Sequence, residues 1–197
     1  MISSYIKAIE YYLPDHAEAN PPEDKVTNKV GIYEKRIAKE DELASDLAVK
    51  AAEKLFRTGA VKREEIDYLI YCTQSPDYPL PATACIIQDR LGLSTQCGAF
   101  DFNLGCSGYV YGLSIAKGLI ESGSAQNVLL LTSDTYSKYV HPNDKSVRVL
   151  FGDGAAATLI SGETSEQAAI GPFVFGTDGS GAGQLIVPAG GLKERYS

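Results

Sequence analysis

Apolar residues occur along this chain in two kinds of segment. Short runs such as residues 67–73 (DYLIYCT) and 127–132 (NVLLLT) are almost continuously apolar, which is typical of strands covered on both faces of a sheet. In longer segments the apolar residues recur every three or four positions, as in an amphipathic helix. The pattern predicts helices at 41–58, 82–91 and 106–123, and strands at 3–12, 67–73, 97–103, 127–132, 155–161 and 170–175, with a further short strand at 182–187.

Strands that alternate with helices predict an α/β fold. We expect βαβ crossovers and a five-stranded, mainly parallel mixed sheet with helices on both faces. Residues 15–40 are polar and contain Pro21 and Pro22, so they are expected to form a loop with little regular structure. Because the sequence shows no repeat and no linker, we expect a single domain. A chain of 197 residues can bury roughly 70% of its unfolded surface in one core.

Cys106 stands where the 97–103 strand turns into the 106–123 helix. That helix is apolar around most of its circumference, which predicts a central, buried position. A thiol at its start would face unpaired backbone N–H groups and the positive end of the helix dipole, and both favour the nucleophilic thiolate. Gly105 and Gly108 allow a tight turn and close approach of a ligand. The alternative is that Cys106 is simply a small buried apolar residue.

Composition excludes several classes of function. The net charge of −7 disfavours nucleic acid and anionic membranes as partners. No apolar run approaches the ~20 residues needed to span a bilayer, and the N-terminus lacks a signal pattern, so we expect a cytoplasmic protein. The four cysteines form no CxxC pair, which argues against a zinc site or a disulfide framework. No GxxxxGK[ST] phosphate-binding loop is present.

Four segments, in order and at suitable spacing, resemble the motifs of β-ketoacyl-acyl-carrier-protein synthase III in the thiolase superfamily. They are residues 75–88 (SPDYPLPATACIIQ), 101–113 (DFNLGCSGYVYGL), 151–156 (FGDGAA) and 177–183 (TDGSGAG). The resemblance covers roughly residues 1–190 and only the first of the two similar halves of a thiolase-like fold. We therefore expect residues 1–197 to form the nucleophile-bearing N-terminal half, with the C-terminal half absent.

The resemblance implies an acyltransferase. Cys106 would attack an acyl thioester to form an S-acyl enzyme, which then condenses with malonyl-acyl-carrier protein to give 3-oxoacyl-acyl-carrier protein, in fatty-acid or related acyl-chain biosynthesis. Acyl-coenzyme A and acyl-carrier protein would be substrates or partners, with no cofactor and no metal. The histidine and asparagine of the family lie in the second half, and neither His16 nor His141 matches them. Residues 1–197 alone are therefore not expected to carry out the condensation.

The family pattern also implies binding residues. Lys29 and Lys145 stand where the family has arginines that hold the coenzyme A nucleotide, and lysine lacks the planar fork of a guanidinium. We therefore expect another starter or donor than acetyl-coenzyme A. Phe151 and Gly152 would shape the substrate pocket. Leu80 would cap the pocket of a partner subunit in a homodimer formed through residues 78–91 and 97–103.

Other interpretations stay open. A hydroxymethylglutaryl-coenzyme-A synthase ranks lower, because it needs a glutamate base near Gln74 and an amide cannot accept the proton. A starter-loading or polyketide-type synthase fits the altered nucleotide-binding residues. A scaffold or dimer partner without turnover is the non-catalytic alternative. Asp134 could orient a group at the end of its strand, although a capping role is favoured.

Overall fold

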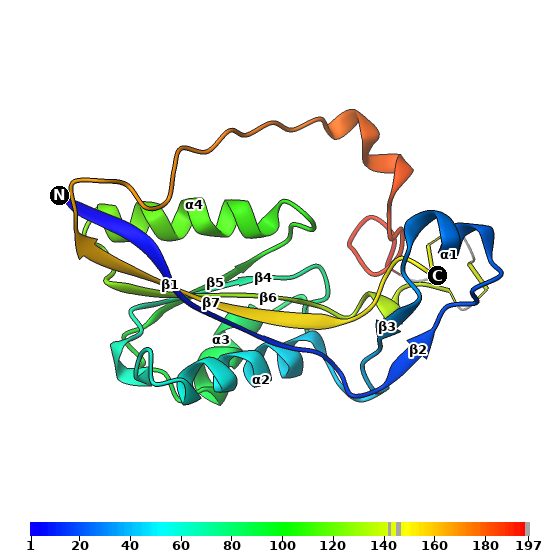
Figure 1. The fold of residues 1–197 in the computed structure, drawn as a ribbon, viewed down its shortest axis with the longest axis horizontal. Coiled ribbons are helices and arrows are strands. Elements are labelled where there is room, and N and C mark those ends of the chain that lie inside the picture. Colours follow the sequence, from blue (N-terminus) through cyan, green and yellow to red (C-terminus); the bar gives the residue numbers. More distant parts are fainter. Residues whose placement is uncertain (142, 145–146, 196–197) are drawn as a thin grey trace.

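Five strands and three longer helices form the body of the protein. A computed structural model describes residues 1–141, 143–144 and 147–195 (Figure 1). The strands lie in the order β1-β7-β6-β4-β5. Helices α2 and α3 cover one face of the sheet and α4 covers the other. The bounds are β1 Ile2–Tyr12, α2 Ala44–Arg57, β4 Tyr68–Cys72, α3 Thr83–Arg90, β5 Gly98–Phe102, α4 Gly108–Glu121, β6 Asn127–Asp134 and β7 Gly154–Thr164.

The sheet contains two parallel and two antiparallel strand pairings. Strand β4 pairs in parallel with both β5 and β6, whereas β7 pairs antiparallel with both β6 and β1. The five strands, the mixed sheet and the helices on both faces are therefore confirmed, but parallel pairings make up half of the sheet rather than most of it. The parallel half carries the α3 and α4 crossovers, and it brings the carboxyl ends of β4, β5 and β6 to the same edge.

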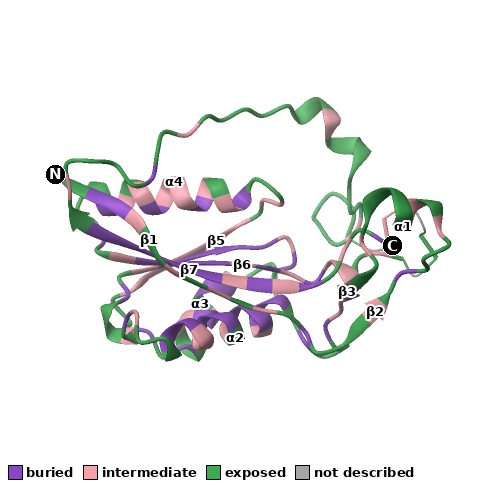
Figure 2. Cartoon of the chain, viewed as in Figure 1, coloured by how far each residue is buried: buried purple, intermediate pink, exposed green. Residues whose placement is uncertain are grey.

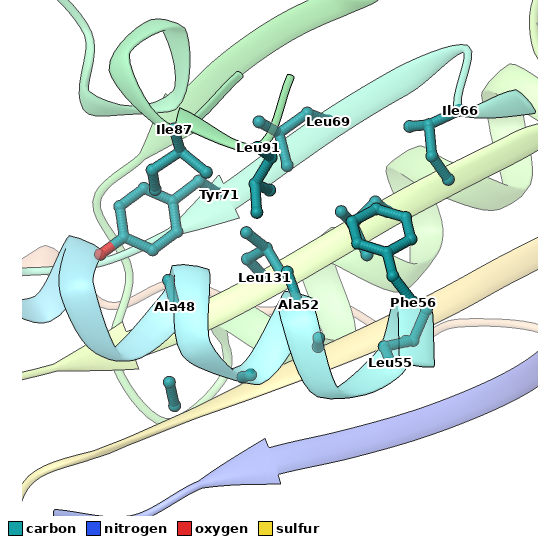
Figure 3. Close-up of a cluster of buried hydrophobic side chains, with 14 of the residues drawn as sticks. Ala48, Ala52, Leu55, Phe56, Ile66, Leu69, Tyr71, Ile87, Leu91 and Leu131 are labelled. Carbon is teal, nitrogen blue, oxygen red and sulfur yellow. The ribbon is translucent and has the colours of Figure 1, made fainter. Parts of the chain in front are cut away.

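The buried strands are apolar on both faces because the sheet separates two cores (Figure 2). In β6, Leu129 and Leu131 face α2, while Val128 and Leu130 face α4. The α2 row of Leu47, Ala51 and Leu55 is fully buried, as its spacing predicts. Figure 3 shows the α2-side cluster, where Ala48, Ala52, Leu55, Phe56, Ile66, Leu69, Tyr71, Ile87, Leu91 and Leu131 converge.

Helix α4 departs from the expected burial. Only one row of it is fully buried, at Gly108, Gly112, Ala116 and Ile120, and Val110 on the outer side is 44% exposed. The row of small residues lets α4 approach the sheet closely, since a Cβ at Gly112 would lie 2.6 Å from the Leu130 side chain. The expectation of a helix buried all round is wrong for the described residues, because a single sheet face covers one side only.

Residues 15–40 are more regular than expected. They form β2 (Ala17–Ala19), α1 (Lys25–Val30) and β3 (Glu34–Arg36), with β2 and β3 paired antiparallel. Helix α1 begins where the Asp24 carboxylate accepts from Val26 N at 2.8 Å, and it ends at Gly31 in a left-handed conformation with φ 74°. The prediction of an irregular loop was wrong because these caps outweigh the polar composition.

The two last predicted strands are also corrected. Residues 170–175 run as extended chain outside any sheet, and residues 179–184 form a short 3₁₀ helix, η3 (Gly179–Gln184). Strand β7 is paired on both sides, with β1 and β6, and the apolar residues Ile170 and Phe173 pack against the α4-side core rather than along a free edge of the sheet. Val174 is accordingly 96% exposed. No described helix is long and apolar enough to cross a membrane.

Candidate active site

Cys106 lies in the turn between β5 and α4, two residues before the helix begins, and its side chain is exposed. The turn closes with a hydrogen bond from Gly108 N to Gly105 O at 2.8 Å. This places the thiol at the helix start, as the sequence predicts. Within the described chain Cys106 is thus exposed and not a buried packing residue.

Cys72, at the end of β4, packs against the turn that holds Cys106. Its Sγ donates to Leu104 O at 3.1 Å, and a Cβ at Gly108 would lie only 2.3 Å from the same sulfur. Burial raises the pKa of the Cys72 thiol to about 11, so this group remains a protonated donor at neutral pH. The turn is thus fixed by a close contact that only glycine at position 108 permits.

The amide of Gln74 lies beside the cysteine turn. Its Nε2 donates to Asn103 Oδ1 at 3.0 Å, and its Oε1 accepts a hydrogen bond from the Tyr136 hydroxyl. A Cβ at Gly105 would lie 2.7 Å from Gln74 Oε1, so the absence of a side chain there makes room for the amide. Gln74 therefore joins the ends of β4 and β5 to the segment that follows β6.

Asp134, at the end of β6, holds the backbone around Gln74. Its Oδ1 accepts from Gln74 N at 2.7 Å, from Ser75 Oγ at 2.9 Å and from Thr73 Oγ1 at 3.1 Å. Burial raises the pKa of Asp134, while these three donors act in the opposite direction. The role is therefore that of a group orienting the 73–75 turn, the less favoured of the two predicted roles.

The turn before β7, residues 151–153, packs against Tyr136 and against β3. The Phe151 ring stacks on Tyr136, with centroids 4.9 Å apart and planes 16° apart. Gly152 packs behind it, where a Cβ would lie 2.9 Å from Arg36 O. Asp153 is buried and accepts from Ala38 N at 2.7 Å and from Ser137 N at 3.0 Å. The FGDG turn is thereby anchored to β3 and to the residues after β6.

Several of these elements border an open cleft of about 700 Å³, which Cys106 itself does not line. Gln74, Asn103, Tyr136 and Phe151 line one part of it, and the apolar residues 185–187 line another. His141 also lines this cleft, and its Nδ1 accepts from Asn143 N at 3.2 Å. His16 contributes its backbone oxygen to Ile37 N in the β2–β3 region. A histidine at the cleft is a finding that the sequence did not predict.

The predicted binding residues do not converge in the described part of the chain. Lys29 is exposed on α1, and Lys145 lies outside the described residues. Leu80 is 81% exposed and does not line the cleft. Phe151 lines the cleft as predicted, and Gly152 lies behind it. Sequence reasoning missed Asn103 and Tyr136 as lining residues, although Asn103 ends the predicted 97–103 strand and Tyr136 lies shortly after the predicted 127–132 strand.

The sequence also did not predict an ionic cluster formed by Glu18, Lys35 and Arg148. The Lys35 side chain is 6% exposed, and its Nζ lies 3.1 Å from Glu18 Oε1 and donates to Arg148 O at 2.6 Å. Arg148 Nη2 donates to both Glu18 oxygens at 3.0 Å. Burial alone would raise the pKa of Glu18, but the Lys35 and Arg148 contacts hold it below its usual value. This cluster ties β2 and β3 to the segment before Phe151.

A mixed sheet, with an exposed cysteine in the turn between its β5 edge strand and a helix, is the architecture of the thiolase-like condensing enzymes. The family of 3-oxoacyl-[acyl-carrier-protein (ACP)] synthase III matches residues 100–179, which include Cys106 and Phe151. A solved 3-oxoacyl-(acyl-carrier-protein) synthase III is 55% identical with a TM-score of 0.96, over 99% of this chain and 60% of its own. The chain belongs to the β-ketoacyl-acyl-carrier-protein synthase III family.

Two further relatives bear on function. The β-ketoacyl-[acyl-carrier-protein] synthase III 3 of Streptomyces coelicolor is 44% identical over 164 residues, which are 83% of this chain and 49% of that protein. The priming β-ketosynthase from the R1128 polyketide biosynthetic pathway is 30% identical with a TM-score of 0.84, over 92% of this chain and 56% of its own. The chain thus spans about half to three fifths of the length of the relatives it matches.

Proposed function

We propose that Cys106 accepts an acyl group from a thioester as the first step of a 3-oxoacyl-acyl-carrier-protein synthesis. The observation that carries this proposal is the exposed Cys106 thiol in a turn whose geometry depends on Gly105 and Gly108. The proposed place for the acyl donor is the cleft lined by Gln74, whose Oε1 lies 2.7 Å from the position of a Cβ on the neighbouring Gly105. Family membership supports the same chemistry.

The proposed acyl transfer needs no group besides the thioester. The Cys106 thiolate attacks the thioester carbonyl carbon, a new S–C bond forms, and the donor's C–S bond breaks. The donor thiol leaves with the proton that Cys106 gave up. The Cys106 backbone N–H is the proposed donor to the oxyanion that develops on the carbonyl oxygen. Coenzyme A and acyl-carrier protein are then substrates, and no resident cofactor is required.

Condensation is proposed for the whole protein. Malonyl-acyl-carrier protein loses carbon dioxide, and the resulting carbanion attacks the S-acyl carbon, which returns Cys106 as a thiolate and gives 3-oxoacyl-acyl-carrier protein. Decarboxylation leaves an enolate that needs positioned donors, and one such donor is typically worth ~100–1,000-fold in rate. We do not assign this role to His141, because its Nδ1 is engaged with Asn143 N and no contact joins it to Cys106 among the described residues.

We further propose the sites for substrate and partner. Phe151 and Gly152 shape the acyl cleft, and Lys29 and Lys145 attract the donor phosphates. Leu80 reaches the cleft of a second copy in a homodimer formed through α3 and β5. The support is that Leu80 is 81% exposed and that β5 is an edge strand with every residue half-buried. Because all four cysteines are free, the thiol chemistry also suits a reducing compartment such as the cytoplasm.

A priming synthase for polyketide-type chains is the second candidate. The R1128 priming β-ketosynthase shares this fold, and Lys29 replaces the arginine expected for nucleotide binding. The two candidates differ in the starter group and in the carrier protein, and both proceed through the same S-acyl Cys106. A panel of acyl donors on coenzyme A and on carrier proteins separates them.

The test is acylation of Cys106. The protein is incubated with acyl-coenzyme A and acyl-carrier-protein thioesters, and the modified cysteine is located by peptide mass spectrometry. We expect the acyl group on Cys106, while Cys85, which is also exposed, stays unmodified and serves as the internal control. Loss of the adduct in Cys106→Ala completes the assignment. Absence of an adduct with every donor, or equal modification of Cys85, would refute the proposal.

A further inference from the structure

The part of the cleft that borders the Gly105–Cys106 turn through Gln74 is polar, whereas a hydrocarbon acyl chain calls for an apolar wall. The polar groups are the amides of Gln74 and Asn103 and the hydroxyl of Tyr136, which are linked in one hydrogen-bonded row. The Gln74 Oε1 lies 2.7 Å from the position of a Cβ on Gly105, the residue before Cys106. An acyl group on the cysteine sulfur would therefore begin beside this row.

We propose that Gln74, Asn103 and Tyr136 select the acyl group, and that they favour a short acyl group with a hydroxy or oxo oxygen over a hydrocarbon of the same length. This inference rests on the proposed acylation of Cys106, and it adds the substrate class. The residues act as specificity determinants in contact with the acyl group.

The row has hydrogen-bonding capacity left for a ligand. The Gln74 amide carries two N–H donors, and one of them is used by Asn103 Oδ1. Within the described residues the second Gln74 donor and the Asn103 amide N–H groups have no partner, and Asn103 is exposed. The Tyr136 oxygen donates its proton to Gln74 and keeps its acceptor lone pairs. An oxygen substituent can thus accept from an amide, and a hydroxyl can also donate to Tyr136.

The row is also held in place. Asp134 Oδ1 accepts a hydrogen bond from Gln74 N at 2.7 Å, and this bond fixes the main chain of the residue that carries the side-chain amide. The Tyr136 ring is held by its stack on Phe151 at 4.9 Å. Because the Gln74 backbone and the Tyr136 ring are held by these contacts, moving them aside to let a hydrocarbon pass would break the contacts. Covering an amide N–H with hydrocarbon leaves it without a partner, and that is unfavourable.

The rest of the cleft fits the carbon part of such a group. Phe151 and residues 185–187 supply apolar surface in the same cleft. An acyl group with one oxygen near the thioester and a short carbon chain would meet both surfaces. One neutral hydrogen bond gained or lost corresponds to about a 3- to 10-fold change in rate.

The experiment compares two donors of matched length, 3-hydroxybutyryl-coenzyme A and butyryl-coenzyme A. The rate of Cys106 acylation is measured by mass spectrometry and divided by the rate with free glutathione, which corrects for the intrinsic reactivity of each thioester. We expect the wild-type protein to prefer the hydroxyacyl donor by about 3- to 10-fold. Gln74→Leu and Tyr136→Phe should bring this ratio to about 1.

Matched controls separate selection from general damage. Gln96→Leu and Tyr5→Phe make the same chemical changes outside the cleft and should keep the wild-type ratio. Tyr136→Phe removes a single oxygen atom, so it remains informative if Gln74→Leu fails to fold. A wild-type ratio near 1, or an unchanged ratio in both cleft variants, overturns the inference while acylation itself stands. No acylation with any donor instead refutes the proposed function, and the inference with it.

Discussion

The ring of Tyr136 lies nearly parallel to the ring of Phe151, with centroids 4.9 Å apart. This stack joins the residues that follow β6 to the turn that precedes β7, and the Tyr136 hydroxyl continues the link to Gln74. Burial, together with the neighbouring Asp134 and Cys106, raises the pKa of Tyr136, so the hydroxyl keeps its proton at neutral pH. One aromatic pair therefore lines the cleft and orients the Tyr136 hydroxyl toward Gln74.

Phe151→Leu should loosen this arrangement without unfolding the protein. Leucine keeps apolar volume but loses the ring contact, which is worth about 0.5–1.5 kcal/mol beyond its buried area. We expect a lower free energy of unfolding by roughly that amount in urea titrations, and a smaller preference between the two acyl donors above. Phe175→Leu, which removes a contact to Tyr111 at 4.8 Å outside the cleft, is the control for the donor preference. An unaltered donor preference in Phe151→Leu would show that the stack does not position Tyr136.

Gly108→Ala should destabilise the cysteine turn. The new Cβ would lie 2.3 Å from Cys72 Sγ, a buried atom that cannot move aside, so we expect a loss of about 1–3 kcal/mol in unfolding free energy. Gly118→Ala is the matched control on the same helix, where a Cβ meets nothing within 4 Å. That change should stabilise by about 0.5–1 kcal/mol, as expected for alanine in a helix.

A second substitution tests the cause of this effect. Cys72→Ala removes the sulfur, and the double variant with Gly108→Ala should recover much of the stability lost in Gly108→Ala alone. The measurement is a double-mutant cycle in urea. Additive effects of the two changes would mean that the Cys72 contact is not what restricts position 108.

Limiting alkylation should mark Cys106 before the other three cysteines. Burial raises the pKa of both Cys72 and Cys97, which leaves these thiols protonated and poorly nucleophilic at neutral pH. Cys85 is exposed and is the real competitor, since it lies in the first turn of α3, but it lacks the flanking glycines of the Cys106 turn. Peptide mapping after brief treatment with iodoacetamide decides the order. Equal labelling of Cys85 would contradict a special reactivity of Cys106.

The strands and helices that could be predicted are those whose apolar positions are the buried positions. Residues 67–73 and 127–132 are apolar at successive positions because β4 and β6 face two cores, and the α2 row repeats at helical spacing. The outer face of α4 could not be predicted, since an apolar residue such as Val110 looks the same whether or not something covers it. For residues 170–175 the pattern failed because apolar residues do not reveal whether a segment pairs with a strand or packs on a helix, and here Ile170 and Phe173 pack against the α4-side cluster.

In the candidate site, too, features set by local sequence could be predicted, whereas contacts between distant segments could not. The position of Cys106 before a helix could be predicted from local sequence, because the strand, the glycines and the helix are contiguous, and the family resemblance then singled it out as the candidate nucleophile. The contact between Gln74 and Tyr136 could not, because these residues are 62 positions apart and meet only when β4 and β6 pair in parallel. The signal was present nonetheless, since each residue follows the end of a predicted apolar strand. Knowledge of strand order would have brought them together.

Glu18→Gln should change how stability depends on pH. Although burial opposes it, the Lys35 and Arg148 contacts keep the folded pKa of Glu18 below its ordinary value of 4.5. A lowered folded pKa adds stability above the unfolded pKa, and this contribution is lost as the pH falls through the folded pKa. The wild-type protein should therefore lose stability below about pH 4.5 in part through Glu18, and Glu18→Gln should lack that part.

At neutral pH, the same substitution should cost about 1–3 kcal/mol, because it leaves the buried Lys35 ammonium with a weaker partner. Glu53→Gln is the control, since the Glu53–Arg63 pair is more exposed on both sides and should contribute at most about 1 kcal/mol. Thermal unfolding between pH 3 and 7 measures both effects. Parallel pH profiles for the wild-type protein and Glu18→Gln would show that the ionic cluster does not hold the Glu18 charge.

Leu80→Asp should prevent the proposed homodimer while leaving the fold intact. Leu80 is 81% exposed in the described chain, so a charged residue there disturbs no packing within one copy. In a dimer it would place a carboxylate in the acyl cleft of the partner, where burying a charge is unfavourable. We expect the wild-type protein to sediment as a dimer at micromolar concentration and Leu80→Asp to sediment as a monomer with an unchanged circular dichroism spectrum. Val174→Asp, at a side chain 96% exposed on the segment after β7, should remain dimeric. A wild-type monomer would remove the proposed interface altogether, whereas a dimeric Leu80→Asp would place it on another surface.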